Sequence, residues 1–353
     1  MQGLGAAVTA PAAVALIIVS FPAGRRRSRA LGVFSAMGAL GFSLGVVVGG
    51  LATTLFGWRG GFLLYVPLAV LVVAVARWRL VDPSSGPPLA AKSVPWVQML
   101  AATSGFLLLA YAIGRTGSTG LGSVTVFGAA GIILIVGFLL WQRRSPQPLL
   151  PVYVLAEPSM GAACAALGFG FAAVTATLFR VATSLQEHDG YSAFAAGLAF
   201  LPQGIAVGVL STPAARAVER RGAATVLTAG LVLLLAGQVW YLFAERGSYT
   251  AHLLPAAVLV GAGIALIYPA AVATVAALVS DRDQGTASGM LTACQQAGGA
   301  VGVAVVTAIG ASNASTLWGI ALPLWGCLGF AVLAVLIGVT MLTWAHGRRS
   351  QPH

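Results

Sequence analysis

Four side chains with hydrogen-bonding groups interrupt long apolar runs of this chain: Gln203, Tyr268, Gln295 and Gln296. Hydrocarbon surroundings offer no water, so each group needs a protein partner or a water-filled cavity. These residues could bind a small molecule through hydrogen bonds, or they could join neighbouring helices. Gln295 and Gln296 are adjacent, so about 100° separates them around a helix, and they cannot both face one partner squarely.

Arg180 is the charge that lies deepest within an apolar run, about one and a half turns before the polar segment QEHDG. In one interpretation its side chain extends to the end of the run and pairs with Glu187 or Asp189. In the other interpretation it binds a ligand or takes part in coupling.

Residues for catalysis or metal binding form no recognisable pattern in the sequence. The four histidines are dispersed, and the three cysteines, Cys164, Cys294 and Cys327, fall in apolar runs where small packing residues are expected. No phosphate-binding loop, serine elbow or metal-ligand spacing occurs. We therefore expect no enzyme activity, no catalytic residue, no metal site and no cofactor.

The composition predicts an integral membrane protein. Of the 353 residues, 58% are hydrophobic and only 8% are charged, whereas soluble domains are about 25% charged. The net charge of +11 comes from arginines scattered between apolar runs, without the basic patches of nucleic-acid binding. We therefore expect a lipid bilayer as the surroundings and no nucleic acid as a partner.

Eleven apolar runs are long enough to be candidate spans, since a spanning helix needs about 20 such residues. They cover 1–20, 32–55, 61–77, 95–114, 121–141, 159–183, 191–215, 222–244, 251–279, 286–310 and 320–344. All eight acids lie in loops or at span ends, so no carboxylate marks a proton or cation site in mid-membrane.

The cations collect in alternate loops. Fifteen lie in one set of loops, namely Arg25, Arg26, Arg27, Arg29, Arg77, Arg79, Lys92, Arg143, Arg144, Arg216, Arg220, Arg221, Arg282, Arg348 and Arg349. The other set holds Arg59, Arg115, Arg180 and Arg246. Cytoplasmic loops carry an excess of Lys and Arg, so the first set is predicted to be cytoplasmic. This orientation places the C-terminus in the cytoplasm.

An internal repeat relates the start of the chain to its last third. The segment GLGAAVTAPAAVAL at 3–16 matches GAGIALIYPAAVAT at 261–274 in eight of fourteen positions, and Pro11 is paired with Pro269. The segment at 30–45 continues the match at 287–302. Both copies run in the same direction, which is the kind of parallel repeat that relates the two halves of major-facilitator transporters.

Three blocks carry a resemblance to a known family: residues 2–68, SLQEHDGYSAFAAGLAFLP and DQGTASGMLTACQQAGGAVGVAV. They resemble the fourteen-spanner drug:proton antiporters of the major facilitator superfamily. The resemblance implies an all-α membrane fold of about 11 helices, with three N-terminal helices of the family missing. It divides the chain into the end of a first bundle at 1–80, a linker with two inserted helices at 81–158, a six-helix bundle at 159–345 and a cytoplasmic tail at 346–353.

The same resemblance suggests roles for small and charged residues. Gly41, Gly45 and Gly49 share one helix face and, with Gly50, match the family's antiporter motif, although Val46 stands where the motif has proline. Such a stripe is either the contact between two rocking halves or ordinary helix packing. Pro11, on the preceding expected span, is grouped with these glycines as a helix-packing candidate. Four charged residues are expected to close a cytoplasmic gate or to anchor the loop: Arg216, Glu219, Arg220 and Arg221.

The function implied is secondary active transport. The resemblance suggests proton-coupled efflux of drugs or other amphipathic small molecules by alternating access across the plasma or inner membrane. It also makes the helices of Gln203, Tyr268, Gln295 and Gln296 cavity-lining ones. Two alternatives remain open: a dedicated metabolite, antibiotic or lipid exporter of the same fold, and a truncated membrane protein that does not transport.

Overall fold

The computed structural model describes a chain built of helices. The described residues are 25–79, 96–115, 121–145, 157–187, 189–243, 249–279, 284–312 and 318–349, and six helical positions near the start: Gly5, Thr9, Ala13, Leu16, Ile17 and Ser20. These ranges contain no strand. Pro11, most of the span expected over 1–20 and the linker at 81–95 lie outside the described residues.

The helices fall into two sets along the chain. The first set is α2 (Arg25–Leu63), α3 (Tyr65–Arg79), α4 (Trp96–Gly114) and α5 (Leu121–Arg144). The second set is α7 (Pro158–Glu187), α8 (Ala193–Ala199), α9 (Leu201–Arg221), α10 (Ala223–Tyr241), the π-helical turn η2 (Tyr249–Leu253), α11 (Leu254–Leu278), α12 (Gln284–Ser312) and α13 (Trp318–Arg349).

Most of these helices are suited to a bilayer. Within the described ranges, eight are long and apolar enough to cross a membrane, or nine if the bent pair α2 and α3 forms one span. The fold is therefore an all-helical membrane fold, and the expected count of about eleven spans stays a prediction. A helix pairs its backbone N–H and C=O groups internally, as it must in lipid, which offers no hydrogen bonds to the backbone. Large apolar side chains cover the outside, as contact with lipid requires, among them Phe56, Leu107 and Val209.

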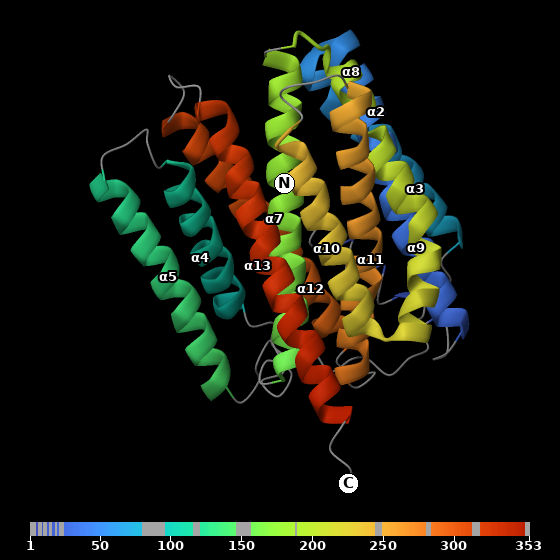
Figure 1. The fold of residues 1–353 in the computed structure, drawn as a ribbon, viewed down its shortest axis with the longest axis vertical. Coiled ribbons are helices and arrows are strands. Elements are labelled where there is room, and N and C mark those ends of the chain that lie inside the picture. The colour runs from blue at the N-terminus through green and yellow to red at the C-terminus, as the bar shows by residue number, and fades with distance from the viewer. Residues whose placement is uncertain are drawn as a thin grey trace.

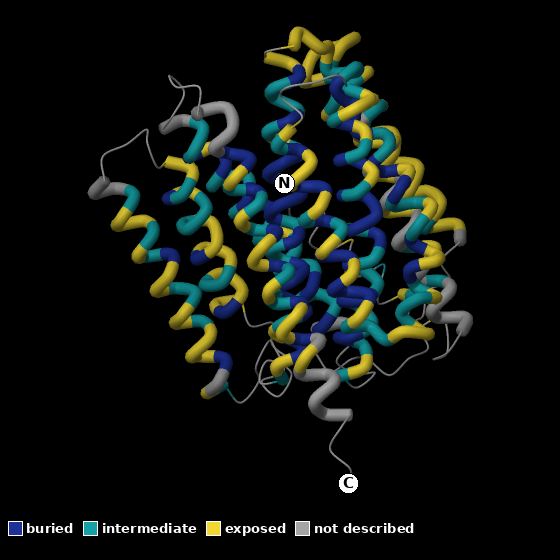
Figure 2. The backbone as a smooth tube through the Cα atoms, viewed as in Figure 1, coloured by how far each residue is buried: buried dark blue, intermediate teal, exposed yellow. Residues whose placement is uncertain are grey.

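The core lies within the second set of helices. α7 packs against α12 and α13, and α11 packs against α9 and α10 (Figure 1). The buried residues concentrate in this group, whereas α3 and α5 are mostly exposed or half-buried (Figure 2). Met160, Leu167, Leu227 and Leu231 are fully buried members of one apolar cluster.

Glycines draw two helix pairs of this core close together. A Cβ atom at Gly263 of α11 would lie 2.8 Å from the carbonyl oxygen of Gly230 on α10. A Cβ atom at Gly298 of α12 would overlap the carbonyl oxygen of Gly168 on α7. Small residues let backbones touch in this way, and van der Waals contact of this kind drives helix association in lipid.

The span expected over 191–215 is a broken helix. Ser192 caps α8, its hydroxyl accepting a hydrogen bond from the Ala195 amide, and Phe200 separates α8 from α9. Pro202 then occupies the first turn of α9, where the missing N–H is not needed. Gly222, at φ +86°, joins α9 directly to α10 through a conformation that other residues rarely adopt.

Helices α4 and α5 form a hairpin at one side of the molecule (Figure 1). A Cβ atom at Gly131 of α5 would lie 2.9 Å from the carbonyl oxygen of Gly105 on α4. The Gln142 amide donates to the Gln98 side-chain oxygen at 3.2 Å, and Gln98 donates to Ser145 at 3.3 Å. Among the described helices outside the hairpin, α4 contacts α12 most.

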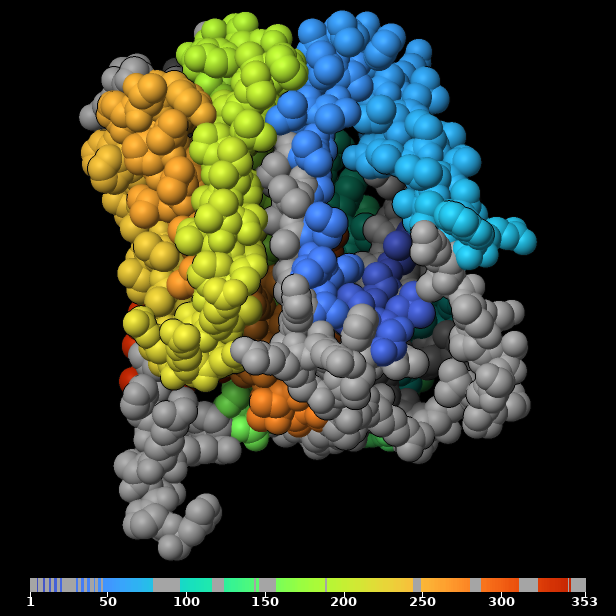
Figure 3. Space-filling model, turned by 90° about the vertical axis from the view of Figure 1, so that its right-hand side faces the viewer, coloured from blue at the N-terminus to red at the C-terminus, as the bar shows by residue number. Residues whose placement is uncertain are grey.

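Helix α2 is long and changes direction near its end. It continues through Val46, where the family motif has proline, and its backbone departs from helical geometry only at Gly57, at φ +69°. α2 packs against α8 and α9, whereas α3 makes few contacts and slopes away from α2 (Figure 3). Directly after Gly57, within α2, the Arg59 guanidinium lies 5.0 Å from the ring centre of Trp58.

Candidate functional site

The contact between α2 and the α8–α9 segment joins the two sets of helices, and Gly50 lies at this contact. A Cβ atom at Gly50 would lie 2.6 Å from the carbonyl oxygen of Ala193, too close for any side chain without movement of the backbone. At Gly41, Gly45 and Gly49, no atom of the described residues lies within 4 Å of the corresponding position. Among the described residues, Gly50 is thus the one of the four motif glycines that contacts the second set of helices.

The internal repeat shows what the equivalent glycines do in the second set. Gly41 and Gly45 correspond to Gly298 and Gly302 of α12. There the two glycines pack on the backbone of α7, beside Gly168 and Ala172. In that copy, the glycines pack helices of the second set against each other. This is the ordinary helix packing that was one of the two interpretations of Gly41 and Gly45.

Gln203 lies at the contact between α9 and α11. Its side chain is only 4% exposed, and a Cβ atom at Gly261 of α11 would overlap the Gln203 carbonyl oxygen. Tyr268 lies further along α11, directly before Pro269, and is half-buried against the apolar core. These two candidates therefore belong to neighbouring helices that are packed together.

Gln295 and Gln296 lie beside the seam between α7 and α12. The preceding residue, Cys294, faces α7, since a Cβ atom at Gly168 would lie 3.3 Å from the Cys294 carbonyl oxygen. Gln295 is half-buried, and Gln296, about 200° around the helix from Cys294, is exposed. The two adjacent residues therefore differ in exposure.

Arg180 lies on α7, near α13 rather than at the α9–α11 or α7–α12 contact. It is half-buried on α7 and lies close enough to the Cys327 thiol of α13 to interact with it electrostatically. The structure thus places Arg180 near the α7–α13 contact, Gln203 at the α9–α11 contact and the Gln295–Gln296 pair on α12. The five predicted cavity residues are distributed over three helix contacts.

The structure adds buried polar residues that the sequence reasoning overlooked. The Thr177 hydroxyl of α7 donates to the Gln238 side-chain oxygen of α10 at 2.6 Å, and both side chains are only 2% exposed. The Nε2 atom of Gln238 is buried, and no described residue forms a hydrogen bond with it. A signal was available, because Gln238 interrupts an apolar run just as Gln203 does. The same signal marks Gln98 and Gln142 of the α4–α5 hairpin.

The predicted gate residues occupy the last turns of α9. Arg216, Glu219, Arg220 and Arg221 are all exposed, and the sharp turn at Gly222 follows them. Cations at a helix C-terminus are favoured by the negative end of the helix dipole. Their position fits both roles suggested from the sequence, the gate and the anchor.

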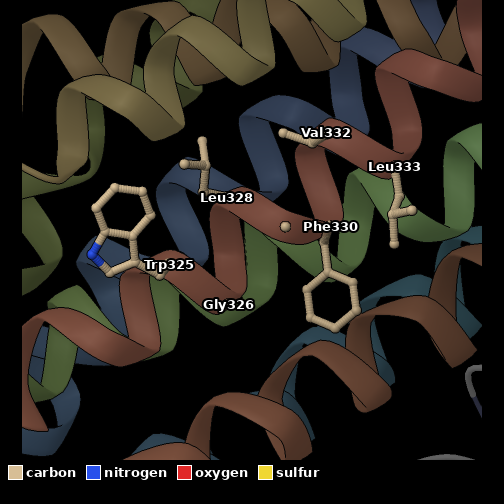
Figure 4. Close-up of a pocket in the computed structure, with 7 residues that line it drawn as sticks. Trp325, Gly326, Leu328, Phe330, Val332 and Leu333 are labelled. Atoms are coloured by element: carbon tan, nitrogen blue, oxygen red, sulfur yellow. The ribbon is translucent and has the colours of Figure 1, made fainter.

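An open apolar groove of about 530 Å³ runs along α13 (Figure 4). Its lining includes Trp325, Leu328, Phe330, Val332 and Leu333, and Figure 4 shows these side chains projecting to both sides of the helix. Trp325 is 52% exposed, so the groove faces outward. Hydrocarbon of this kind suits contact with lipid chains more than recognition of a polar ligand.

The described acids lie at helix ends. Glu157 precedes α7, Glu187 is the last residue of α7, Asp189 follows it, and Glu219 lies in the last turn of α9. The other four acids fall outside the described residues. Across the ranges that the structure describes, no three side chains of His, Cys, Asp or Glu gather where they could hold a metal ion.

Comparison with known proteins connects this architecture to a family. The profile of the family described as Major Facilitator Superfamily matches residues 1–113 and 159–352. The unmatched residues 114–158 include α5 of the hairpin. The match therefore covers the second set of helices and the first set as far as α4.

Three curated relatives illustrate the similarity. The cephamycin export protein CmcT of Amycolatopsis lactamdurans is 31% identical over 89% of this chain and 65% of its own length. The puromycin resistance protein pur8 of Streptomyces alboniger is 31% identical over 98% of this chain and 71% of its own length. The multidrug resistance protein Stp of Mycobacterium tuberculosis is 29% identical over 87% of this chain and 57% of its own length. The chain thus spans about two thirds of the length of such relatives.

Proposed function

The chain belongs to the Major Facilitator Superfamily, and from this premise we propose that it is a secondary active transporter that exports drugs or other amphipathic small molecules. The observation that carries the proposal is its similarity to relatives named for antibiotic export and for multidrug resistance. These relatives fit the fourteen-spanner drug:proton antiporter group that the sequence resembles. The chain is a multi-pass membrane protein, and we place it in the plasma membrane.

The proposed mechanism is alternating access, in which two halves rock against each other around a site near the midplane. The contact between α2 and the α8–α9 segment supports this mechanism, because it joins elements of the two sets of helices. We assign Gly50 to this moving contact. The proposed ligand contacts remain Gln203, Tyr268, Gln295, Gln296 and Arg180, which are distributed over three helix contacts.

Protons are the proposed coupling ion, since the resemblance is to proton-driven exporters. The acids among the described residues lie at helix ends rather than in mid-membrane. The described part of the chain therefore assigns no carboxylate to carry the proton. Collapse of the proton gradient by an uncoupler is expected to abolish export.

A dedicated antibiotic exporter is the second candidate function. Two of the relatives are named for a single antibiotic, cephamycin or puromycin. A dedicated exporter would protect cells against one compound class, whereas a multidrug exporter would act on several unrelated amphipathic compounds.

Export can be tested in bacteria that lack their own efflux pumps. Cells that express the protein are expected to retain less of an amphipathic fluorescent dye than cells with an empty vector, and to grow at higher concentrations of antibiotics, puromycin included. An uncoupler should restore dye retention. Equal retention and equal growth in both strains, at verified membrane expression, would contradict the proposal.

A pair of glycine variants on α2 tests the role of the contact. Gly50→Val is expected to reduce export severalfold, because its side chain would meet the backbone of Ala193. Gly38→Ala is the control, since no described atom lies within 4 Å of its Cβ position. Undiminished export by Gly50→Val would remove this contact from the mechanism.

A further inference from the structure

The seam between α7 and α12 is formed by two matching rows of small residues. On α7 the row is Cys164, Gly168 and Ala172, and on α12 it is Cys294, Gly298 and Gly302. Each row has a spacing of four, so its members share one helix face. Successive members meet in the same order along the two helices: Gly298 meets Gly168, and Gly302 meets Ala172.

This packing brings the two cysteines together. Cβ atoms at Gly298 and Gly302 would overlap the α7 backbone, so the helix backbones are in direct contact. One turn before these glycines, Cys164 and Cys294 occupy the matching positions of the two rows, since a Cβ atom at Gly168 would lie 3.3 Å from the Cys294 carbonyl oxygen, and their thiols interact with each other. Both cysteines are free, Cys164 being buried and Cys294 half-buried. A disulfide requires Cα atoms about 4.4–6.8 Å apart, a separation that only closely packed backbones provide.

We propose that Cys164 and Cys294 form a dithiol site whose oxidation links α7 to α12 through a disulfide. The oxidant is a hydroperoxide of the kind that dissolves in membranes. Cys294 is the less buried residue of the two, and its sulfur attacks the peroxide O–O bond, which yields a sulfenic acid on Cys294 and releases an alcohol. The Cys164 thiol then attacks the sulfenic sulfur, forms the S–S bond and releases water. The two thiols lose two electrons and the peroxide gains two.

The modification would act on a helix that carries two proposed ligand contacts. Gln295 and Gln296 follow Cys294 directly, so a link at Cys294 fixes the rotation of α12 about its axis at that level. Formation of the link does not depend on transport, and its test reads the thiols themselves.

The third cysteine provides an internal control. Cys327 is fully buried on α13, and its polar neighbours are Thr177 and Arg180 of α7. Thr177 and Arg180 lie nearer the C-terminal end of α7 than Cys164 does, by more than three turns. Cys327 should therefore stay a free thiol when the other two react.

The experiment counts thiols in the purified, folded protein before and after treatment with cumene hydroperoxide. Alkylation and intact-mass measurement should show a fall from three free thiols to one, without dimer formation. Peptide mapping should find Cys164 joined to Cys294. Cys327→Ser should fall from two free thiols to none, whereas Cys164→Ser and Cys294→Ser should each form no intramolecular disulfide.

A second oxidant and a spacing variant complete the test. Iodine is small and apolar, so it reaches buried thiols that a bulkier peroxide does not. Gly168→Ala should slow the link, because its Cβ would lie 3.3 Å from the Cys294 carbonyl oxygen. Gly161→Ala should not, because no described atom lies within 4 Å of its Cβ position. Three thiols that survive both oxidants, a disulfide to Cys327 or disulfide-linked dimers would overturn the proposal.

Discussion

At the scale of single residues, the hydrogen bond between Thr177 and Gln238 is the clearest buried polar contact. Thr177→Val removes the donor and leaves the Gln238 amide without a hydrogen bond from the described residues, so we expect a loss of stability of about 0.6–1.7 kcal/mol. Gln238→Met removes the acceptor together with the unpartnered Nε2 atom, so its cost should be smaller. Thermal unfolding in detergent measures both changes.

The double variant separates the hydrogen bond from packing. If the two residues interact, Thr177→Val should cost less in the Gln238→Met background than in the original chain. Thr177→Ser keeps the hydroxyl and serves as the control for loss of the methyl group. A larger cost for Gln238→Met than for Thr177→Val would show that the Nε2 atom is stabilised in the folded protein.

Residue positions show where sequence reasoning reached its limit. Polar residues within apolar runs could be recognised from the sequence, and Gln203 is indeed buried in a helix contact. Which partner each one faces depends on the rotation of its helix, and close glycine contacts such as Gly261 against Gln203 set that rotation. The separation of Arg180 from Gln203 was for this reason not predictable.

At the scale of elements, the α4–α5 hairpin depends on the approach of Gly131 to Gly105. In Gly131→Ala the new Cβ would lie 2.9 Å from backbone atoms of Gly105 and Leu109, so the helices must separate. Overpacking of this kind costs about 1–3 kcal/mol. Hydrogen exchange should become faster over both helices of the hairpin, and the thermal midpoint should fall.

Gly137→Ala is the matched control on the same helix. No described atom lies within 4 Å of its Cβ position, so the variant should stabilise α5 by about 0.5–1 kcal/mol through better helix propensity. If the two variants behaved alike, the glycine contact would not hold the hairpin.

Helix positions were easier to predict than helix breaks. The runs at 95–114 and 121–141 correspond to α4 and α5, since the length of an apolar run nearly determines where a spanning helix lies. The break at Phe200 was not predicted, because it lies inside the apolar run at 191–215, where hydropathy gives no signal. The turn at Gly57 falls in the short connection between the expected spans 32–55 and 61–77.

At the scale of the whole molecule, the distribution of arginines predicts one orientation in the membrane. α5, α9 and α13 each end in arginines, and these three helices end at the lower end of the molecule in Figure 1. At the opposite end the described cations are few, namely Arg59, Arg115 and Arg180. Cytoplasmic loops of membrane proteins carry an excess of Lys and Arg, so the lower end should face the cytoplasm.

Reporter fusions test this orientation. A fluorescent protein fused after His353 should be fluorescent, and alkaline phosphatase at the same site should be inactive, because each reporter works on one side of the membrane only. Alkaline phosphatase inserted in the connection between α4 and α5 should be active, since this connection joins helix ends at the opposite side. Active phosphatase after His353 would reverse the predicted orientation, and the exposed arginines at the end of α9 would then face outward and could not form a cytoplasmic gate.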